Sequence, residues 1–209
     1  RVRAAQVWDI SVDAVAFEGG RFLGPADESG EPRAMTFGEL AGLLPSTGNT
    51  VIGVSNVDVQ SWGASFGTHI VDVEVDPETG KVALLRYTIV QDVGKAINPM
   101  QVEGQLEGGT TQGIGWALYE GYAYDSEGQM ENPTLLDYKL PTAMDVPSFE
   151  TVLVEVPYPE HPFGARGVGE MPIVPPPGAI ANAINDAIGH RVFELPMTPA
   201  RILESMGKI

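Results

Sequence analysis

The sequence contains no cysteine among its 209 residues. This absence excludes disulfides, thiolate zinc sites, thiol nucleophiles and cysteine-bound iron–sulfur clusters on this chain. It is compatible with the cytoplasm, where disulfides are rare, and we expect a cytoplasmic protein. Basic residues are also scarce, because 12 lysines and arginines stand against 28 aspartates and glutamates, for a formal net charge of -16. Such a balance argues against a nucleic-acid partner bound through phosphate contacts.

Long apolar runs are missing as well, and no stretch approaches the length that spans a bilayer. The opening "RVRAAQVWDI" has basic residues without a following apolar stretch, so it does not indicate a secretory signal. It resembles the last turns of an amphipathic helix and lacks an initiator methionine. We therefore expect a fragment, or one piece of a larger chain, folded as one domain or as a large domain with an appendage.

Turn and cap signals predict an α+β fold with a mixed or antiparallel sheet, hairpins and packed helices. "DAVAFEGGRFLG" predicts two short strands about a Gly-Gly turn, and "GTHIVDVEVDPETGKVALLRYTIV" predicts a longer hairpin. Strand-like pieces are expected near residues 121–125, 151–157 and 190–195. Helices are expected over "MTFGELAGLL", over residues 99–120 after Asn98, over "PPGAIANAINDAIG" and over "TPARILESMG".

The predicted helix over residues 99–120 carries five glycines, each of which costs about 1 kcal/mol relative to alanine. Gln105, Gly108, Gly109 and Gln112 recur at helical spacing and form one stripe of two amides with bare backbone between them. A flat polar group could approach such a surface closely, since each amide offers donors and an acceptor. The alternative is a close contact with another helix or a sheet.

The loop "GARGVGEMPIVPPPG" places one carboxylate, Glu170, after alternating glycines and before a run of prolines. Gly164, Gly167 and Gly169 allow a positive φ or the close approach of a ligand to the backbone. Glu170 is therefore a candidate general base, and Arg166 is near enough in sequence to pair with it. The alternative is a capping or solvated surface acid.

The segment "GASFG" matches the G-x-S-x-G pattern of serine hydrolases around Ser65. A nucleophile elbow needs a strand before the serine and a helix after it, but here an alternating strand follows. The sequence has three histidines, which are His69, His161 and His190. None has the context of a nucleophile elbow, so the hydrolase alternative is weak, and none has metal-binding spacing.

Three segments, in this order, resemble the C-terminal end of the molybdenum-binding subunit of the xanthine dehydrogenase, aldehyde oxidase and carbon monoxide dehydrogenase family. They are "SFGTHIVDVEVDPETGKV", "DVGKAINPMQVEGQLEGGTTQGIGWALYEG" and "GARGVGEMP". The resemblance implies that residues 1–209 form a C-terminal molybdopterin-binding domain of the α+β type seen in xanthine dehydrogenase. The chain would then be a fragment or a split subunit of a larger molybdenum subunit.

The resemblance also implies roles for individual residues. Gln105 matches the family's pterin-binding glutamine, and Glu170 matches its catalytic base. The backbone of Gly167, Val168 and Gly169 would lie beside the cofactor. The implied cofactor is molybdenum–molybdopterin, often the cytosine dinucleotide form in bacterial members, and no protein side chain is expected to ligate the metal.

The implied reaction is the oxidative hydroxylation of an aldehyde or N-heterocycle with water as the oxygen source. Electrons would leave through iron–sulfur clusters and FAD on partner chains or domains. Other parts of the family's site are not recognisable in this sequence, so the isolated chain would be an incomplete enzyme within a multi-subunit assembly. A scaffold or assembly domain of the same fold is the alternative, which the presence of both Gln105 and Glu170 disfavours.

Overall fold

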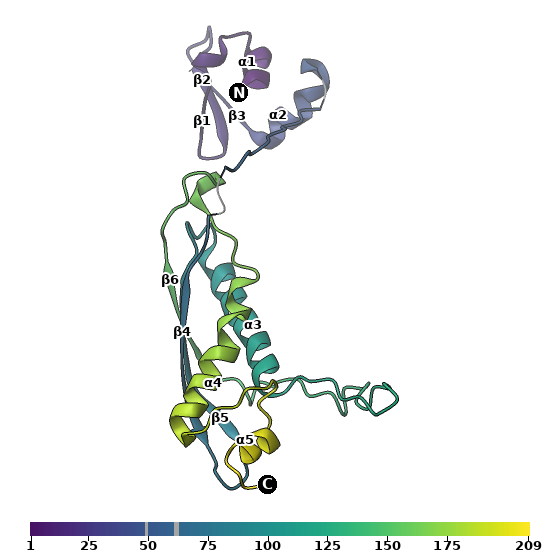
Figure 1. Ribbon diagram of the computed structural model, residues 1–209. Helices are drawn as coiled ribbons and strands as arrows, with labels where there is room; N and C mark the ends of the chain where they lie inside the picture. Colours follow the sequence, from purple (N-terminus) through teal and green to yellow (C-terminus); the bar gives the residue numbers. More distant parts are fainter. Residues whose placement is uncertain (49, 61–62) are drawn as a thin grey trace. The chain divides into compact units, whose positions relative to one another are not determined.

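The computed structural model describes residues 1–48, 50–60 and 63–209, and the chain divides into two compact units (Figure 1). Unit 1 comprises Arg1–Asn56 and unit 2 comprises Val57–Ile209. The prediction that residues 1–209 form one C-terminal molybdopterin-binding domain stays a prediction. In the described part of the chain, no helix combines the length and the apolar character that crossing a membrane requires.

Unit 1 is a small antiparallel sheet covered by helices. The sheet has the order β1 (Ala16–Glu18), β2 (Arg21–Ala26) and β3 (Pro32–Thr36), and the first turn is the expected Gly-Gly pair. The helical elements are α1 (Val2–Trp8), η1 (Val12–Ala14), α2 (Phe37–Leu43) and η2 (Leu44–Thr47). A core of six buried residues joins the sheet to the helices, and these are Ala4, Ala5, Val15, Phe22, Met35 and Leu40.

The predicted capping box at the start of α2 is confirmed. The hydroxyl of Thr36 accepts a hydrogen bond from the backbone of Glu39 at 3.2 Å, and the Glu39 carboxylate accepts from the backbone of Thr36 at 2.6 Å. The helix therefore begins directly where β3 ends. Strand β3 itself was missing from the sequence prediction, because its register is set by pairing with β2 rather than by a local pattern.

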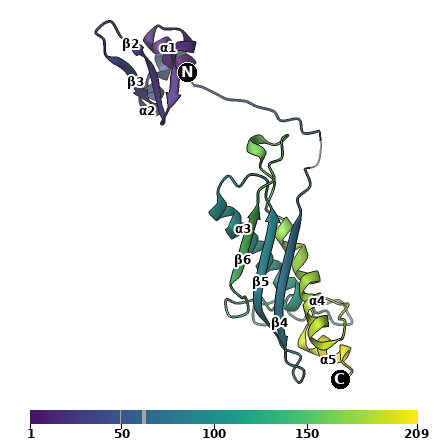
Figure 2. The same ribbon diagram turned by 90° about the vertical axis from the view of Figure 1, so that its left-hand side faces the viewer.

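Unit 2 has one layer of strands and one layer of helices (Figure 2). The sheet order is β4 (Gly67–Val75), β5 (Val82–Asp92) and β6 (Phe149–Val154), with β4 antiparallel and β6 parallel to β5. The other elements are α3 (Pro99–Leu118), η3 (Pro162–Gly164), η4 (Met171–Ile173), α4 (Pro175–Ile188) and α5 (Pro199–Ser205). The mixed sheet, hairpins and packed helices confirm the predicted α+β class.

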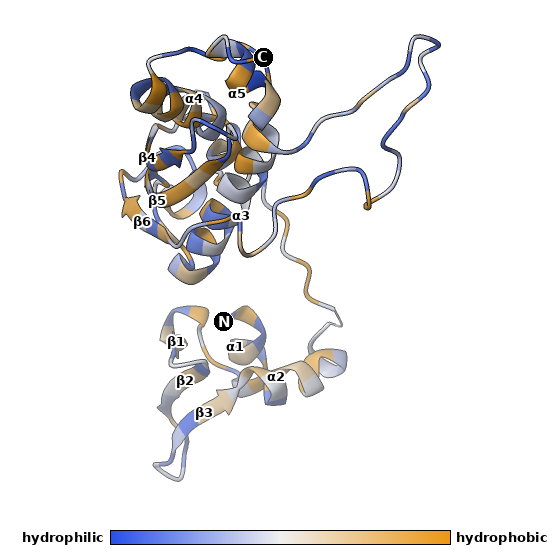
Figure 3. Ribbon diagram, turned by 90° about the horizontal axis from the view of Figure 1, so that it is seen from below, coloured by the Kyte–Doolittle hydropathy of each residue, from blue (hydrophilic) through white to orange (hydrophobic). Residues whose placement is uncertain are grey.

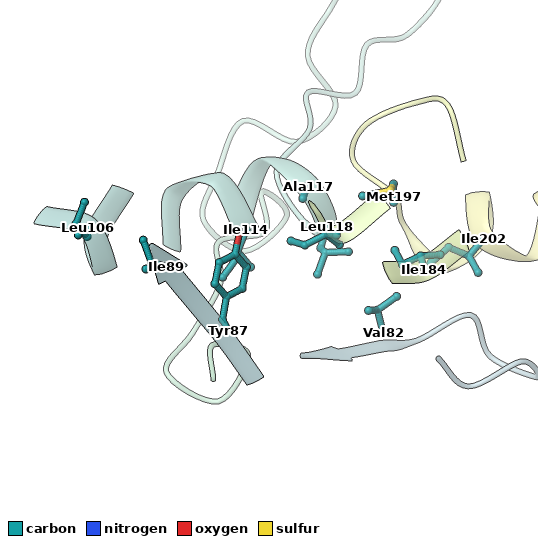
Figure 4. Close-up of a cluster of buried hydrophobic side chains, with 11 residues drawn as sticks. Val82, Tyr87, Ile89, Leu106, Ile114, Ala117, Leu118, Ile184, Met197 and Ile202 are labelled. Atoms are coloured by element: carbon teal, nitrogen blue, oxygen red, sulfur yellow. The ribbon is translucent and has the colours of Figure 1, made fainter. Parts of the chain in front are cut away.

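The core of unit 2 lies between the central strand and the helices (Figure 4). Tyr87 and Ile89 of β5 are fully buried and face Leu106 and Ile114 of α3. Apolar residues of α4 and α5 complete this layer, as the hydropathy colouring shows (Figure 3). Burial of this apolar surface fixes α3 on the sheet and so decides which face of α3 remains outside.

Two strand predictions were wrong. Near residues 121–125 only an isolated bridge between Tyr124 and Met130 forms, within a long loop that projects from the body of unit 2 (Figure 1). Residues 190–195 form no strand, since Val192 packs on the core while Phe193 stays 90% exposed. Both segments have strand-like composition but lack a paired neighbour, and a strand is stable only in a sheet.

Candidate functional site

Helix α3 begins where the sequence indicates. The side chain of Asn98 accepts a hydrogen bond from the backbone of Gln101 at 3.3 Å, and Pro99 occupies the first turn. The predicted stripe of Gln105, Gly108, Gly109 and Gln112 is present, and three of its four members are exposed. Only Gly109 is buried, so the stripe divides into a packed part and an open part.

The packed part explains two of the five glycines in α3. A Cβ at Gly113 would lie 2.6 Å from Cγ of Pro176, which no side chain can tolerate without movement. A Cβ at Gly109 would likewise overlap the ring of Pro172. The glycines and the prolines each recur after four residues, so two proline rings fit into the surface of α3. The alternative reading of the stripe as a close contact is therefore correct for this part.

The open part of α3 includes Gly108 of the stripe and Gly104, which precedes Gln105. A Cβ at either glycine would meet no atom within 4 Å. Each of these glycines costs the helix about 1 kcal/mol, and no packing inside unit 2 compensates for that cost. The exposed amide of Gln105 lies between them. This part of α3 leaves room against bare backbone for a molecule outside the described chain.

The loop before Glu170 uses its glycines in two ways, and both are compatible with the prediction of a positive φ or an accessible backbone. Gly164 has a φ of 74°, in the left-handed region that was expected. Gly167 and Gly169 do not have a positive φ, and a Cβ at either position would meet nothing within 4 Å. The backbone of Gly167 and Gly169 is therefore not covered by other atoms on the side where a side chain would be, as at Gly104 and Gly108.

A hydrogen bond brings the two glycine-rich segments together. The Nε2 atom of Gln105 donates to the backbone oxygen of Gly169 at 3.3 Å. Both residues line an open cavity of about 380 Å³ at the N-terminal end of α3, together with Val168 and Arg166. Four of the five predicted site residues thus lie in one place or directly beside it: Gln105, Gly167, Val168 and Gly169.

Glu170 directly follows the last residue that lines this cavity. Its side chain is exposed and makes no cap interaction with the 3₁₀ turn η4 that it precedes. Within residues 1–48, 50–60 and 63–209, its carboxylate has no hydrogen-bond or ion-pair partner. The carboxylate therefore has no partner in the described chain, one residue beyond Gly169 of the cavity lining.

Arg166 does not pair with Glu170, as the sequence had suggested it could. It forms an ion pair with Asp92 at the end of β5, with 3.2 Å between Nε and Oδ2. The sequence pattern indicated no role for Asp92, the last residue of β5. It also indicated no site role for the residues after β5 that line the cavity, which are Val93, Lys95, Ile97 and Asn98. The available signal was their position in "DVGKAINP", between the end of a strand and a helix cap.

The charge at the cavity rim is largely neutralised. Lys95 bonds to Glu155 at 2.9 Å, and Glu155 also accepts from the backbone of Ala96 at 2.7 Å. The hydrogen bond from Lys95 and then that from Ala96 lower the pKa of Glu155. The remaining positive field comes from the N-terminal end of the α3 dipole, which favours an anionic group there.

The hydrolase alternative finds no support around Ser65. Its hydroxyl donates to the backbone oxygen of Asp92 and accepts from Nε2 of Gln91 at 3.0 Å. Strand β4 follows it, and no histidine hydrogen-bonds it in the part of the chain that the structure describes. Ser65 therefore fixes the end of β5 instead of forming a nucleophile elbow.

A second cavity of about 400 Å³ lies in unit 1, with an apolar and aromatic lining. Phe17, Phe22 and Phe37 are its aromatic members, and Arg1 and Arg3 are its charged members. It contains none of the predicted site residues and no carboxylate. The cavity at α3 is therefore the candidate site, because it combines an amide, bare backbone and a neighbouring unpaired acid.

Comparison with known proteins shows what the chain is similar to. The profile of the molybdopterin cofactor-binding domain matches residues 1–147. The xanthine dehydrogenase molybdenum-binding subunit of Escherichia coli O157:H7 is 40% identical over 161 residues, which cover 77% of this chain. The carbon monoxide dehydrogenase large chain of Hydrogenophaga pseudoflava is 31% identical over 215 residues, which cover 97% of this chain.

Solved structures agree in fold. Quinoline 2-oxidoreductase from Pseudomonas putida 86 aligns with a TM-score of 0.78 and 30% identity over 99% of this chain. The chain is much shorter than these proteins, since it spans 21% of the Escherichia coli subunit and 26% of the Hydrogenophaga chain. It also spans 27% of the quinoline 2-oxidoreductase chain.

Proposed function

Because the chain belongs to the molybdopterin cofactor-binding domain family, we propose that it forms one wall of the cofactor site in a molybdenum hydroxylase. The observation that carries this proposal is the hydrogen bond from Gln105 to Gly169, which brings the open stripe of α3 and the Glu170 loop to one cavity. The metal itself would take no ligand from this chain. The remaining walls would come from other parts of the molybdenum subunit.

The residues at the cavity suit a flat, polar ring system. Gly169 lines the cavity and carries no side chain that would block an approaching ring, and Gly167 precedes the lining residue Val168. Gly104 and Gly108 lie on α3 on either side of Gln105 in the sequence and are likewise uncovered. The second N–H and the carbonyl oxygen of the Gln105 amide are available to the heteroatoms of a pterin. The N-terminal end of α3 favours the phosphate that molybdopterin carries, either alone or within a cytosine dinucleotide.

The bound cofactor would supply the redox step, in which the oxygen of water enters a C–H bond and two electrons and two protons are released. The chain would supply position and proton transfer. A carboxylate oxygen of Glu170 would accept the proton released from water, and Glu170 suits this role because it is unpaired in the described chain and directly follows Gly169, which lines the cavity. Val168 and the bare backbone beside it would hold the cofactor next to that carboxylate.

The substrate class that we propose is an aldehyde or an N-heterocycle. The relatives act on varied molecules by their names, which include nicotine 6-hydroxylase of Paenarthrobacter nicotinovorans and aldehyde oxidoreductase of Megalodesulfovibrio gigas. Several relatives are subunits of complexes, which supports partner subunits for this chain. Iron–sulfur clusters and FAD on those partners would carry the electrons away, in a cytoplasmic assembly.

Replacement of Glu170 by glutamine in the intact enzyme tests the proposal. Glu170→Gln keeps the shape of the side chain but removes the base, so turnover should fall by at least about 100-fold. Molybdenum and pterin content should stay near normal, because the amide removes no contact that holds unit 2 together. Metal analysis and steady-state kinetics measure both quantities.

A matched control is Glu78→Gln in the turn between β4 and β5, another exposed acid. This variant should keep full turnover. Full turnover in Glu170→Gln would contradict the assignment of the base. Loss of the cofactor together with turnover would instead place Glu170 among the residues that retain it.

A further inference from the structure

Arg166 stands directly before the glycines of the Glu170 loop, and its side chain is almost completely enclosed. The side chains of Arg166 and Asp92 are each 11% exposed, and 3.2 Å separates Nε of the first from Oδ2 of the second. Their ion pair therefore joins the loop to the end of the central strand β5. An ion pair at this depth is costly unless further hydrogen bonds satisfy both partners.

The guanidinium of Arg166 makes those further bonds. Its Nη1 atom donates to the backbone oxygens of Gly63 and Ala64, at 2.6 Å each. Its Nε atom lies 3.4 Å from the backbone oxygen of Val156, and its Cζ atom lies 5.1 Å from the ring centre of Tyr158. One planar group thus connects segments on three sides, which a lysine ammonium cannot reproduce.

Asp92 is held with equal firmness. Its Oδ1 atom accepts from the backbone of Gly94 at 3.0 Å and from that of Val156 at 3.4 Å. The backbone nitrogen of Arg166 donates to Val93 at 3.1 Å, so both ends of the ion pair are also tied through the main chain. The loop therefore enters the candidate site from a fixed point.

A second attachment follows Glu170 in the chain. The side chain of Gln91, which is 2% exposed, contacts the sulfur of Met171 at 3.6 Å and donates to the backbone oxygen of Phe66 at 3.0 Å. Neighbouring residues of β5, Gln91 and Asp92, thus hold the two ends of the segment Gly167–Glu170. The segment is short enough that its path is largely determined by these ends.

Between the two attachments, the hydrogen bond from Gln105 to the backbone oxygen of Gly169 also holds the segment, but it reaches the backbone before Glu170 and not the carboxylate. Gly167 and Gly169 have open space where a Cβ would be, and the carboxylate of Glu170 has no partner in the described chain. Nothing at Glu170 itself can therefore set the direction of its carboxylate. We propose that Arg166 is a positioning residue, whose pairing with Asp92 holds Glu170 at the cavity; this inference rests on the proposed function of Glu170.

Arg166→Lys in the intact enzyme tests the inference, because it keeps the charge beside Asp92 and removes the planar fork. We expect kcat per molybdenum to fall by about 10-fold or more, since small displacements of a catalytic group are expensive. KM should change by less than about twofold, since no substrate contact is removed. Amide hydrogen exchange in residues 167–171 should accelerate, and molybdenum content should be normal.

Asp92→Asn is the second variant, and it should shift kcat and loop exchange in the same direction through the other partner. The matched control is Arg86→Lys, which alters an exposed Arg–Asp pair on the same sheet, with side chains 63% and 47% exposed. This control should leave kcat and loop exchange unchanged. Glu170→Gln is measured in parallel as the test of the base.

Unchanged kcat per molybdenum and unchanged loop exchange in Arg166→Lys would overturn the inference. So would a lower molybdenum content with a normal kcat per molybdenum, because Arg166 would then serve only to retain the cofactor or the fold. Full turnover in Glu170→Gln would overturn the proposed function instead. The two failures are therefore distinguishable, since each appears in a different variant.

Discussion

Two faces of one helix put glycine to opposite uses. Toward the C-terminal half of α3, Gly109 and Gly113 are pressed against proline rings, so a methyl group would collide. Toward the N-terminal half, Gly104 and Gly108 face open space. The first pair brings helices together, whereas the second pair leaves a bare surface. Glycine permits close packing in the first case, whereas in the second it leaves the helix backbone uncovered within the described chain.

The largest effect on stability is expected on the packed side. Gly113→Ala would place Cβ 2.6 Å from Pro176 and 2.9 Å from the backbone oxygen of Ile173, which cannot move aside freely. Overpacking should exceed the gain in helix propensity, for a net loss of about 1–2 kcal/mol in the free energy of unfolding. Urea denaturation measures it, and unchanged stability would mean that α3 and α4 are not in close contact.

Unit 2 also has a partly buried ionisable group, His69 of β4, which contacts Tyr87. Burial lowers the pKa of His69 from 6.5 to about 4, and its Nε2 atom has no hydrogen-bond partner in the described chain. A lowered pKa means that its contribution to stability is complete above about pH 6.5. Between about pH 6.5 and 4 the unfolded chain binds a proton that the folded chain does not, so stability falls.

The size of this fall should be about 1–2 kcal/mol, after allowance for the partial exposure of the ring. His69→Gln keeps a polar contact to Tyr87, which lies 3.1 Å from Nδ1, and should flatten the slope between these pH values. Denaturation at pH 7.5 and at pH 4.5 gives the slope for both proteins. The exposed His190→Gln serves as the control, and equal slopes in all three proteins would refute the burial of His69.

Much of the fold was predictable because its signals are local. The capping box of Thr36 and Glu39, the cap at Asn98 and the hairpin of β4 and β5 each depend on residues near one another in the sequence. Strand β3 was missed and residues 190–195 were wrongly assigned, because strand pairing depends on a distant neighbour. Local patterns predict elements better than they predict partners.

The candidate site was likewise predictable only where the signals are local in the sequence. Helical spacing placed Gln105 on a stripe, and the glycine pattern of the loop singled out Gly169 and Glu170. Gln105 and Gly169 meet in the structure. No sequence pattern connected Arg166 with Asp92, because that contact depends on how the loop returns to the end of β5. Nor could spacing separate the packed glycines from the open ones, since all lie on adjoining faces of one helix.

The smallest effect on stability is expected at the open glycines of α3, Gly104 and Gly108. A Cβ at Gly108 meets nothing within 4 Å, so Gly108→Ala should raise the free energy of unfolding by about 0.5–1 kcal/mol. Gly42→Ala in α2 has the same free space and should give a similar gain.

The two variants should diverge in the intact enzyme. If the bare surface of α3 accommodates the pterin, Gly108→Ala should lower molybdenum and pterin content despite its greater stability, as Gln105→Ala should by removing an amide. Gly42→Ala should leave the content unchanged. A gain in stability with normal cofactor content in Gly108→Ala would show that Gly108 does not contact the cofactor. Cofactor binding would then not explain why α3 has a glycine at this position, where alanine is more favourable.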